Sequence, residues 1–212
     1  MRRVNATKKT RVQRSEEARD ALFQAAAEIV GEYGYIDASI SRITQRANLA
    51  HGTFYNYFAS RQDIFDELLP VLGAKMLVHI RQQVSGAGSF LEREERSFRA
   101  FFGFLKRMPY FLRILNDAEI FAPKAHRQHF RNITDGYLRF LRKARATGEI
   151  ADLNDEALEA LAYILIAARG YLALRYMTAE RGIELPEEAV RVYMQLVSSG
   201  IARKGTSASS MP

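Results

Sequence analysis

The sequence predicts an all-helical protein, on three observations made along its 212 residues. Apolar side chains recur every three or four positions through most of the chain, which is the spacing of one face of an α-helix. The chain holds 13 glycines and only 5 prolines, so residues that interrupt helices are few. No segment has a convincing strand pattern, and a hydrophobic content of 48% is enough for a substantial core. We therefore expect about nine helices and no sheet.

The first two helices are predicted from their end signals. Ser15 is a suitable N-cap for the first helix, and Glu16 and Glu17 follow it, where negative charge favours the helix dipole. Gly34 is the expected stop of this helix. Ser39 is the expected cap of a short second helix, whose apolar residues again follow the helical spacing.

A tight turn and two more helices are expected next. Asn48 follows the second helix, and asparagine tolerates left-handed backbone better than most residues, so it suits a tight turn. A third helix fits the aromatic-rich residues 51–58. Ser60 is the expected cap of a fourth helix over residues 61–80, in which Pro70 predicts a kink or a break.

The second half of the chain predicts five more helices. Residues 85–89 (Ser-Gly-Ala-Gly-Ser) are the clearest linker. The predicted helices cover residues 90–107, 110–118, 124–147, 154–179 and 187–203. Residues 157–168 carry a single charge, so the helix that contains them is expected to be buried on nearly every side.

The excess of positive charge lies at the N-terminus. The formal net charge is +7, and residues 1–14 contain no acidic residue. The basic residues of this segment are Arg2, Arg3, Lys8, Lys9, Arg11 and Arg14. Clustered positive charge indicates a polyanionic partner, with nucleic acid the first candidate. A disordered tail that only increases solubility is the alternative.

Several classes of protein are excluded by what the sequence lacks. Without cysteine, the chain has no disulfide, no thiolate metal site and no cysteine nucleophile. We find no signal peptide and no long uncharged apolar run, so we expect a cytoplasmic protein without a membrane partner. We also find no glycine-rich phosphate loop and no nucleophile elbow, so we expect no enzyme, no catalytic residue and no cofactor.

One pair of histidines has the spacing of a metal site. His126 and His129 lie three residues apart and share a helix face. No third ligand stands out, and Arg127 and Arg131 lie beside them. We therefore interpret this face as solvated and basic, and we expect no bound metal.

Residues 39–58 have the plan of a helix-turn-helix, in which the second helix enters the major groove of DNA. The outer face of that helix must be small or polar, as His51, Gly52, Thr53, Tyr55 and Asn56 are. Phe54 and Phe58, four apart, are expected to point inward. Tyrosine hydroxyls reach phosphate oxygens and asparagine reads adenine, while Arg42, Arg46 and Arg61 flank the unit as phosphate ligands.

The run over residues 39–61 resembles the DNA-binding signature of the TetR family of transcriptional regulators (TetR/AcrR type). It reads Ser-Ile-Ser-Arg-Ile-Thr-Gln-Arg-Ala-Asn-Leu-Ala-His-Gly-Thr-Phe-Tyr-Asn-Tyr-Phe-Ala-Ser-Arg, and the preceding helix closes on Tyr33-Gly34-Tyr35. The resemblance covers roughly residues 15–68. The polar outer face, the flanking basic residues and the resemblance together predict these DNA-binding residues: Ser39, Arg42, His51, Gly52, Thr53, Tyr55, Asn56, Tyr57 and Arg61.

Three positions depart from the family pattern. Asn48 stands where glycine is usual, and Tyr57 replaces a frequent histidine. Ala50 stands where a serine or threonine often caps the recognition helix, a loss that costs about 1 kcal/mol of helix stability. We therefore assign no DNA contact to Ala50. The N-terminal arm resembles segments that follow the minor groove or the DNA backbone, which is the weaker part of the comparison.

The resemblance also predicts the domain organisation. We expect a disordered basic arm over residues 1–14, a helix-turn-helix DNA-binding domain over 15–61, a ligand-binding and dimerisation domain over 62–203, and a disordered tail over 204–212. The family implies a homodimer built from the last two long helices of each subunit. These helices carry more apolar surface than a small domain needs to hide, although they could instead only complete the core of one chain.

A ligand pocket is expected between the middle helices. Small-molecule sites are mostly apolar with a few polar groups, and the many phenylalanines favour a hydrophobic or aromatic effector. The candidate lining residues are Phe101, Phe104, Leu105, Phe111, Ile114, Leu115, Phe121, Phe130, Tyr137, Tyr163 and Arg169. Ordinary core packing is the alternative for each phenylalanine, and an interface salt bridge is the alternative for Arg169.

The function that these features imply is ligand-responsive repression. The family resemblance implies a repressor that leaves a palindromic double-stranded operator when a small effector binds, with the helix over residues 61–80 as the lever. The alternative is a helical, dimeric small-molecule-binding protein that does not read an operator. Specific, salt-sensitive binding to a palindrome distinguishes the two.

Overall fold

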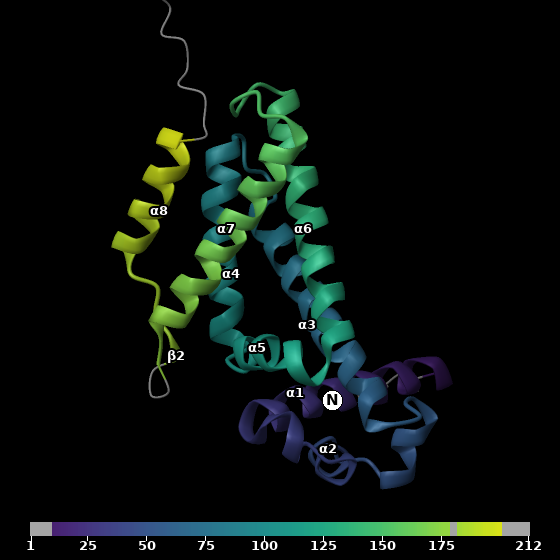
Figure 1. Cartoon of the computed structure of the whole chain (residues 1–212). Helices are drawn as coiled ribbons and strands as arrows, with labels where there is room; N and C mark the ends of the chain where they lie inside the picture. The colour runs from purple at the N-terminus through teal and green to yellow at the C-terminus, as the bar shows by residue number, and fades with distance from the viewer. Residues whose placement is uncertain (1–9, 179–181, 201–212) are drawn as a thin grey trace, which may run out of the picture. The chain divides into compact units, whose positions relative to one another are not determined.

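The computed structural model describes residues 10–178 and 182–200, and this part of the chain is helical except for one small hairpin (Figure 1). The elements in chain order are α1 (Arg11–Asp37), α2 (Ile40–Arg46), η1 (His51–Asn56), α3 (Arg61–Val84), α4 (Phe90–Arg107), α5 (Phe111–Phe121), α6 (Pro123–Ala146), α7 (Asp155–Tyr176), β1 (Met177–Thr178), β2 (Gly182–Ile183) and α8 (Glu187–Gly200). The all-helical prediction is confirmed. The expectations for residues 1–9 and for the C-terminal tail lie outside the described residues.

Helix α1 begins earlier than its sequence suggests. Thr10 is the N-cap: its side chain accepts from the Gln13 backbone, while the Gln13 side chain accepts from the Thr10 backbone. This reciprocal capping box satisfies two backbone donors, so it starts the helix before Ser15, and the predicted cap at Ser15 is wrong. Two of the basic residues expected in a disordered arm, Arg11 and Arg14, therefore lie within the helix.

The end of α1 follows the prediction. Gly34 has φ 81° and ψ 170°, a backbone conformation that interrupts the helix within its range. Glycine adopts positive φ without the steric cost that a Cβ would impose, which is why the sequence signal at this position was reliable.

The segment from α2 to η1 forms the predicted helix, turn and helix. The Ser39 hydroxyl caps α2 by accepting from the Arg42 backbone at 3.3 Å. Asn48 has φ 54°, as expected for the turn, and the Leu49 backbone donates to the Thr44 carbonyl at 2.9 Å. The helix predicted over residues 51–58 is instead a 3-10 helix that ends at Asn56.

Helix α3 is one continuous helix that includes Pro70. Its start is capped by Ser60, whose hydroxyl accepts from the Asp63 backbone at 3.3 Å while the Asp63 carboxylate accepts from the Ser60 backbone at 3.0 Å. Pro70 predicted either a kink or a break in this helix. The helix continues through the proline, so a break is excluded.

The chain forms two compact units, each assembled from two segments. Unit 1 contains residues 1–71 and 110–126, and unit 2 contains residues 72–109 and 127–212. Helix α5 thus belongs to the unit that holds the helix-turn-helix. The predicted domains are contiguous along the chain, whereas these compact units are not, and the predicted boundary between residues 61 and 62 stays a prediction.

The core of unit 1 holds α1 against α5. The Tyr35 hydroxyl donates to the Ile114 carbonyl at 3.3 Å, and its ring stacks on Phe121 with ring centres 5.7 Å apart. Gly31 allows this close approach, because a Cβ there would overlap with the ring of Tyr110. Arg113 donates to the Gly31 carbonyl at 2.6 Å, so a side chain of α5 satisfies a carbonyl of α1.

Unit 2 contains α4, most of α6, α7, the hairpin and α8. Helix α7 ends at Tyr176, and the residues that follow pair as two antiparallel strands, with Met177 opposite Ile183. The prediction of a helix over 154–179 is therefore wrong at its end, and the prediction of no strand is wrong for this hairpin. The partner strand lies beyond residues 179–181, so a pattern of local spacing does not reveal the pairing.

Helix α7 is much less buried than its apolar sequence suggests. Its apolar window has a mean hydropathy of 1.5, but only 28% of that window is buried in the single chain. Tyr171 is 77% exposed and Ile164 is 63% exposed. The expectation of burial on nearly every side is therefore wrong for one chain. By length and composition alone, α7 is the one helix among the described residues that could span a membrane.

Candidate DNA-binding and effector sites

The outer surface of the helix-turn-helix is polar and accessible. His51, Gly52, Tyr55 and Asn56 are all exposed, and Tyr55 exposes 53% of its surface. The rings of His51 and Tyr55 meet edge to face, with centres 5.7 Å apart. These residues span η1 from its first residue to its last, which gives the chain a compact set of hydrogen-bonding groups on its surface.

The aromatic residues behind this surface form the core, as predicted. Phe54 is fully buried and Phe58 is 2% exposed, with ring centres 5.4 Å apart. Phe58 also meets Phe23 of α1 edge to face at 5.4 Å. Because η1 is short and its N-cap residue Ala50 makes no side-chain hydrogen bond, this packing positions the exposed residues more than the helix itself does.

Two predicted phosphate-binding arginines are held by the C-terminal end of α1. Arg42 donates to the Asp37 carbonyl at 3.1 Å, and its guanidinium lies over the Tyr33 ring at 4.8 Å. Arg61 donates to the Ile36 carbonyl at 3.0 Å. Both side chains remain at the surface, because both residues are exposed. Each therefore keeps guanidinium donors for an anion, in an orientation that α1 restricts.

Arg46, in contrast, is occupied by acidic neighbours. It donates to Glu28 at 3.0 Å and to both carboxylate oxygens of Glu32, at 2.9 and 2.8 Å. Its hydrogen bond lowers the pKa of Glu32 below the ordinary value. This cluster stabilises the packing of α2 on α1 and leaves Arg46 less suited to bind phosphate than Arg42 or Arg61.

The remaining predicted DNA-binding residues are partly covered. Ser39 uses its hydroxyl as the α2 cap and is half-buried. Thr53 and Tyr57 are also half-buried, Thr53 inside η1 and Tyr57 just after it. The nine predicted residues thus all lie in the segment from Ser39 to Arg61 of unit 1, with differing accessibility.

The eleven predicted ligand-binding residues divide between the two units. Phe111, Ile114, Leu115 and Phe121 belong to α5 in unit 1, where Ile114 and Phe121 pack against Tyr35. The residues in unit 2 are Phe101, Phe104, Leu105, Phe130, Tyr137, Tyr163 and Arg169. A single pocket lined by all eleven therefore stays a prediction.

Within unit 2, the predicted residues have different environments. Phe104 and Leu105 are buried, and Phe101 meets Phe102 edge to face at 5.4 Å. Tyr163 is 50% exposed, so it does not line an interior site of one chain. Tyr137 and Arg169, in contrast, are brought together in a buried polar cluster.

The buried cluster is centred on Glu94 of α4, which is fully buried. Arg169 of α7 donates to its carboxylate at 2.6 Å, Tyr137 of α6 at 2.6 and 2.7 Å, and Tyr193 of α8 at 2.5 Å. Arg169 also donates to the Ser97 hydroxyl at 3.0 Å. Four helices of unit 2 thus meet at one carboxylate.

The charges of this cluster stabilise one another. Burial acts to lower the pKa of Arg169, but the Glu94 carboxylate, together with Tyr137 and Tyr193, outweighs burial and holds that pKa above the ordinary value. Burial also raises the pKa of Tyr137 and of Tyr193, so both hydroxyls keep their protons and donate to Glu94. The cluster is therefore an ion pair with two neutral donors.

Sequence reasoning identified Arg169 and Tyr137 but missed Glu94 and Tyr193. A signal for Glu94 exists: it lies four residues after Phe90 and four before Phe98, on the buried face of α4. A charge on an apolar helix face requires a partner, which here lies 75 residues away along the chain. His129 is buried, so the interpretation of the face that it shares with His126 as solvated is wrong for this residue. The described residues contain no group of three side chains that could hold a metal ion.

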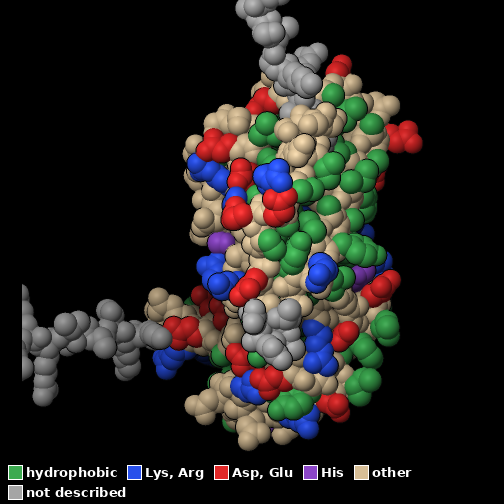
Figure 2. Space-filling model, turned by 90° about the vertical axis from the view of Figure 1, so that its left-hand side faces the viewer, with side chains coloured by type: hydrophobic (Ala, Val, Ile, Leu, Met, Phe, Trp, Pro, Cys, Tyr) green, Lys and Arg blue, Asp and Glu red, His purple; other side chains and the backbone are tan. Residues whose placement is uncertain are grey.

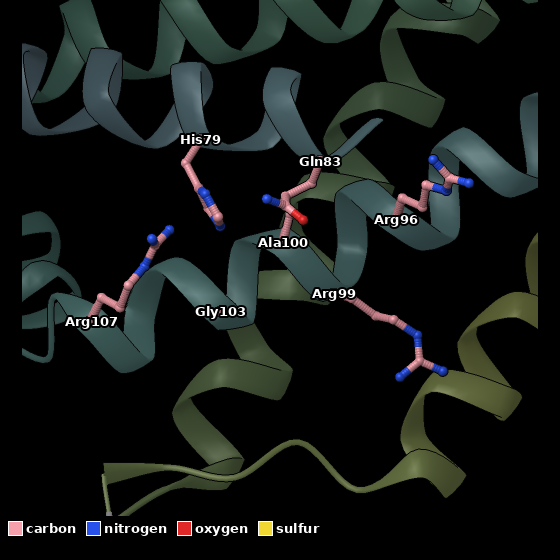
Figure 3. A pocket seen from close by; sticks show the side chains of 7 residues that line it. All are labelled: His79, Gln83, Arg96, Arg99, Ala100, Gly103 and Arg107. Carbon is pink, nitrogen blue, oxygen red and sulfur yellow. The ribbon is translucent and has the colours of Figure 1, made fainter. Parts of the chain in front are cut away.

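A second feature that sequence reasoning missed is a hollow of about 500 Å³ in unit 2. Figure 3 shows its lining, which consists of His79, Gln83, Arg96, Arg99, Ala100, Gly103 and Arg107. The first two belong to α3 and the others to α4. None of the predicted ligand-binding residues lines this hollow, and its character is polar and basic instead of aromatic.

Comparisons with known proteins agree with the helix-turn-helix geometry. Residues 22–68 match the model of the family described as bacterial regulatory proteins, tetR family. The chain is 39% identical over 67 residues to the uncharacterised HTH-type transcriptional regulator YvdT of Bacillus subtilis, covering 32% of each chain. It is 32% identical over 78 residues to the fatty acid metabolism regulator protein of the same species, covering 37% of this chain and 33% of the relative. The matched segment thus spans about a third of these curated relatives.

Solved structures extend the similarity to the fold of the whole chain. A TetR family transcription regulator from Marinobacter aquaeolei is similar with a TM-score of 0.68 at 16% identity, covering 91% of this chain and 100% of that one. The fatty acid degradation regulator of Bacillus halodurans is similar with a TM-score of 0.69 at 19% identity, covering 90% and 96%. These relatives are all named as regulators, of transcription or of fatty acid metabolism or degradation. Residues 22–68 of this chain therefore match the TetR family of bacterial regulatory proteins, and the chain shares the helical fold of solved TetR-family regulators.

Proposed function

We propose that this protein is a cytoplasmic transcription repressor that binds a palindromic operator as a homodimer and releases it when a small effector binds. The observation that carries the proposal is the polar surface around η1, backed by buried Phe54 and Phe58. A short helix that is held by its core and exposes hydrogen-bonding side chains suits the major groove.

The roles of the DNA-binding residues follow from their accessibility. Tyr55 and Asn56 are the most suitable for contact with DNA, because both are exposed and carry hydrogen-bonding groups. Arg42 and Arg61 provide phosphate contacts from either side of the surface. Gly52 is exposed, and a Cβ added there would meet nothing within 4 Å, so it permits a close approach of the DNA backbone.

The dimer is supported by the exposed apolar surface of α7 and α8. The large apolar side chains exposed on these helices are Tyr163, Ile164, Tyr171, Leu174, Val192 and Leu196. Figure 2, which views the side where α8 lies in Figure 1, shows hydrophobic side chains gathered on this face. Burial of a contiguous apolar patch against a second copy of the chain is favourable. A two-fold dimer also matches the symmetry of a palindromic operator.

The effector is proposed to be a hydrophobic small molecule, as the many phenylalanines suggest. Two of the similar proteins are named as regulators of fatty acid metabolism or degradation, which supports an acyl compound as the first candidate. An aromatic effector is the second candidate, because phenylalanine side chains bind either class through apolar contact.

Coupling between effector and operator is proposed to act through α3. This helix begins in unit 1 and ends in unit 2, and the boundary between the two units, after Val71, lies close to Pro70. Recognition helices that fit adjacent major grooves must be about 34–36 Å apart. An effector that prefers a state with a different spacing weakens operator binding by its differential affinity for the two states.

Binding to DNA from upstream of the protein's own gene tests this proposal. Fluorescence anisotropy at increasing salt concentration compares the wild type with Tyr55→Ala and Tyr55→Phe. We expect sequence-specific binding that Tyr55→Ala weakens by about tenfold or more, and that Tyr55→Phe weakens less, because it keeps the ring and loses only the hydroxyl.

The alternative function predicts a different outcome. A helical dimer that does not read an operator binds all sequences weakly, with a strong dependence on salt and no effect of Tyr55→Ala beyond that of nonspecific contacts. This result would contradict operator recognition. The far-ultraviolet circular dichroism of each variant verifies that the helices are retained.

A further inference from the structure

The hollow between α3 and α4 in unit 2 has an unusual charge distribution. Three arginines, one histidine and one glutamine line it, together with Ala100 and Gly103, and no carboxylate is among the lining residues. Figure 3 shows these side chains on two facing helices. The lining therefore offers many hydrogen-bond donors and a positive potential to any small group that enters.

Two of the three arginines are neutralised from outside the hollow. Arg96 forms an ion pair with Glu92 of the preceding turn. Arg99 donates to both oxygens of Glu187 of α8 at 2.7 Å each, and to Glu95 at 2.9 Å. In Figure 3, the Arg99 side chain extends away from His79. These two arginines border the hollow but keep little unbalanced charge.

Arg107 and His79 form the other end of the hollow. Among the described residues, Arg107 takes part in no ion pair, and its guanidinium points toward the His79 ring in Figure 3. Burial lowers the pKa of His79, and the charge of Arg107 lowers it further, while a hydrogen bond with the Ala100 backbone acts in the opposite direction. The charges of His79 and Arg107 therefore disfavour each other. An anion placed between them would remove this repulsion.

The floor of the hollow is a glycine in the middle of a helix. Gly103 lies inside α4, where glycine costs about 1 kcal/mol relative to alanine. Packing does not require this glycine, because a Cβ there would lie 3.8 Å from His79 Nε2, which is an ordinary contact. The absence of a side chain leaves the space next to His79 open.

We propose that this hollow binds an anionic group, a phosphate or a carboxylate, of a small molecule. Arg107 binds the anion with its guanidinium, and Gln83 contributes its amide from the same face of α3. The anion also favours the protonated ring of His79, which then has an N–H for the anion besides its hydrogen bond with the Ala100 backbone. The identification of that molecule as the effector rests on the proposed function. An acyl effector with an anionic end would then place its charged group here.

The test uses the full-length protein and two kinds of probe. Inorganic phosphate and pyrophosphate represent the phosphate source, and decanoate represents the carboxylate source. The chain contains only four histidines, so the ring signals of labelled protein can be followed individually by NMR. Each titration is matched in ionic strength with sodium chloride, so that screening does not imitate binding. We expect the His79 signals to shift in a saturable way either with the phosphate probes or with decanoate.

Three variants make the test specific. Arg107→Gln is expected to weaken binding of the anion by about tenfold or more, because it removes a charge-assisted hydrogen bond. Gly103→Glu places a carboxylate beside the hollow and is expected to abolish binding. Gly103→Ala is the matched control: it fits the space, favours the helix and is expected to retain binding. Thermal unfolding of each variant verifies the fold.

Two outcomes would overturn the anion site: no saturable shift with any probe, or equal binding by the Gly103→Glu and Gly103→Ala proteins. Operator binding is measured on the same samples, because it separates the two proposals. Anion binding by a protein that reads no operator would contradict the repressor function and support the site. Operator binding without anion binding would contradict the site and support the function.

Discussion

At the scale of single residues, the most constrained group in this protein is the Glu94 carboxylate. It is fully buried, and side chains from α6, α7 and α8 donate to it. A buried charge is tolerated only where such partners compensate the loss of hydration. This carboxylate therefore makes the packing of α8 depend on α4, since Tyr193 is both a core residue and one of its donors.

Replacement of Glu94 is expected to destabilise the fold strongly. Glu94→Gln keeps the size of the side chain but leaves the Arg169 charge buried without its partner, which costs about 3–5 kcal/mol. The free energy of unfolding, measured by urea denaturation, checks this value.

Glu95 provides the matched control for this prediction. It lies on the same helix and pairs with Arg99, but its side chain is 43% exposed. Glu95→Gln is therefore expected to cost less than about 1 kcal/mol, because exposed ion pairs contribute little. Similar losses in the two variants would show that the Glu94 cluster is not a buried charge network.

At the scale of elements, the turn between α2 and η1 depends on one backbone conformation. Asn48 has φ 54°, and it lies between α2 and η1, which carry side chains proposed to contact DNA. Left-handed backbone is energetically unfavourable for a residue with a Cβ, although the cost is smaller for asparagine than for most other residues. The orientation of η1 relative to α2 thus depends on a local preference as well as on the Phe54 core.

Substitutions at Asn48 are expected to follow this preference. Asn48→Gly relieves the steric cost and is expected to leave stability unchanged within about 0.5 kcal/mol, or to raise it slightly. Asn48→Ala is expected to lower stability by about 1 kcal/mol, because alanine has neither freedom at positive φ nor a polar group to compensate. Thermal unfolding measures both. A more stable alanine variant would contradict the left-handed turn.

At the scale of the whole molecule, α7 and α8 expose more apolar surface than a single chain can bury. Leu196 is 69% exposed and Tyr171 is 77% exposed. Burial of apolar surface contributes about 25 cal/mol per Å², so a face of this kind favours association. The same helices hold Arg169 and Tyr193 of the Glu94 cluster on their inner sides, so the proposed interface is supported by a rigid polar core.

A charge placed in the proposed interface is expected to separate the subunits. Leu196→Glu would bury one carboxylate from each subunit in this interface, and the dimer dissociation constant is expected to rise by about a hundredfold or more. Analytical ultracentrifugation measures this change. Val78→Glu is the control, because Val78 of α3 is also exposed, at 47%, but lies outside the proposed interface. Equal dissociation in both variants would contradict this interface.

Local features of this fold could be read from the sequence, because their causes are local. The Ser39 cap, the Asn48 turn, the Gly34 interruption and the inward rings of Phe54 and Phe58 each depend on residues within one or two turns. One error, the start of α1, arose because a competing local signal was stronger. The capping box at Thr10 started α1 before Ser15, because it satisfies two backbone donors instead of one.

The sequence by itself determined the helical fold and the helix-turn-helix segment, whose residues lie within a continuous run. Only the tertiary structure decided the features that join distant residues: the Glu94 cluster, the basic hollow between α3 and α4, and the division of the phenylalanines between two units. Helical spacing reports which face of a helix is apolar, but it carries no information about which other helix covers that face. The partners of Glu94, Gly103 and Tyr193 are therefore set by packing.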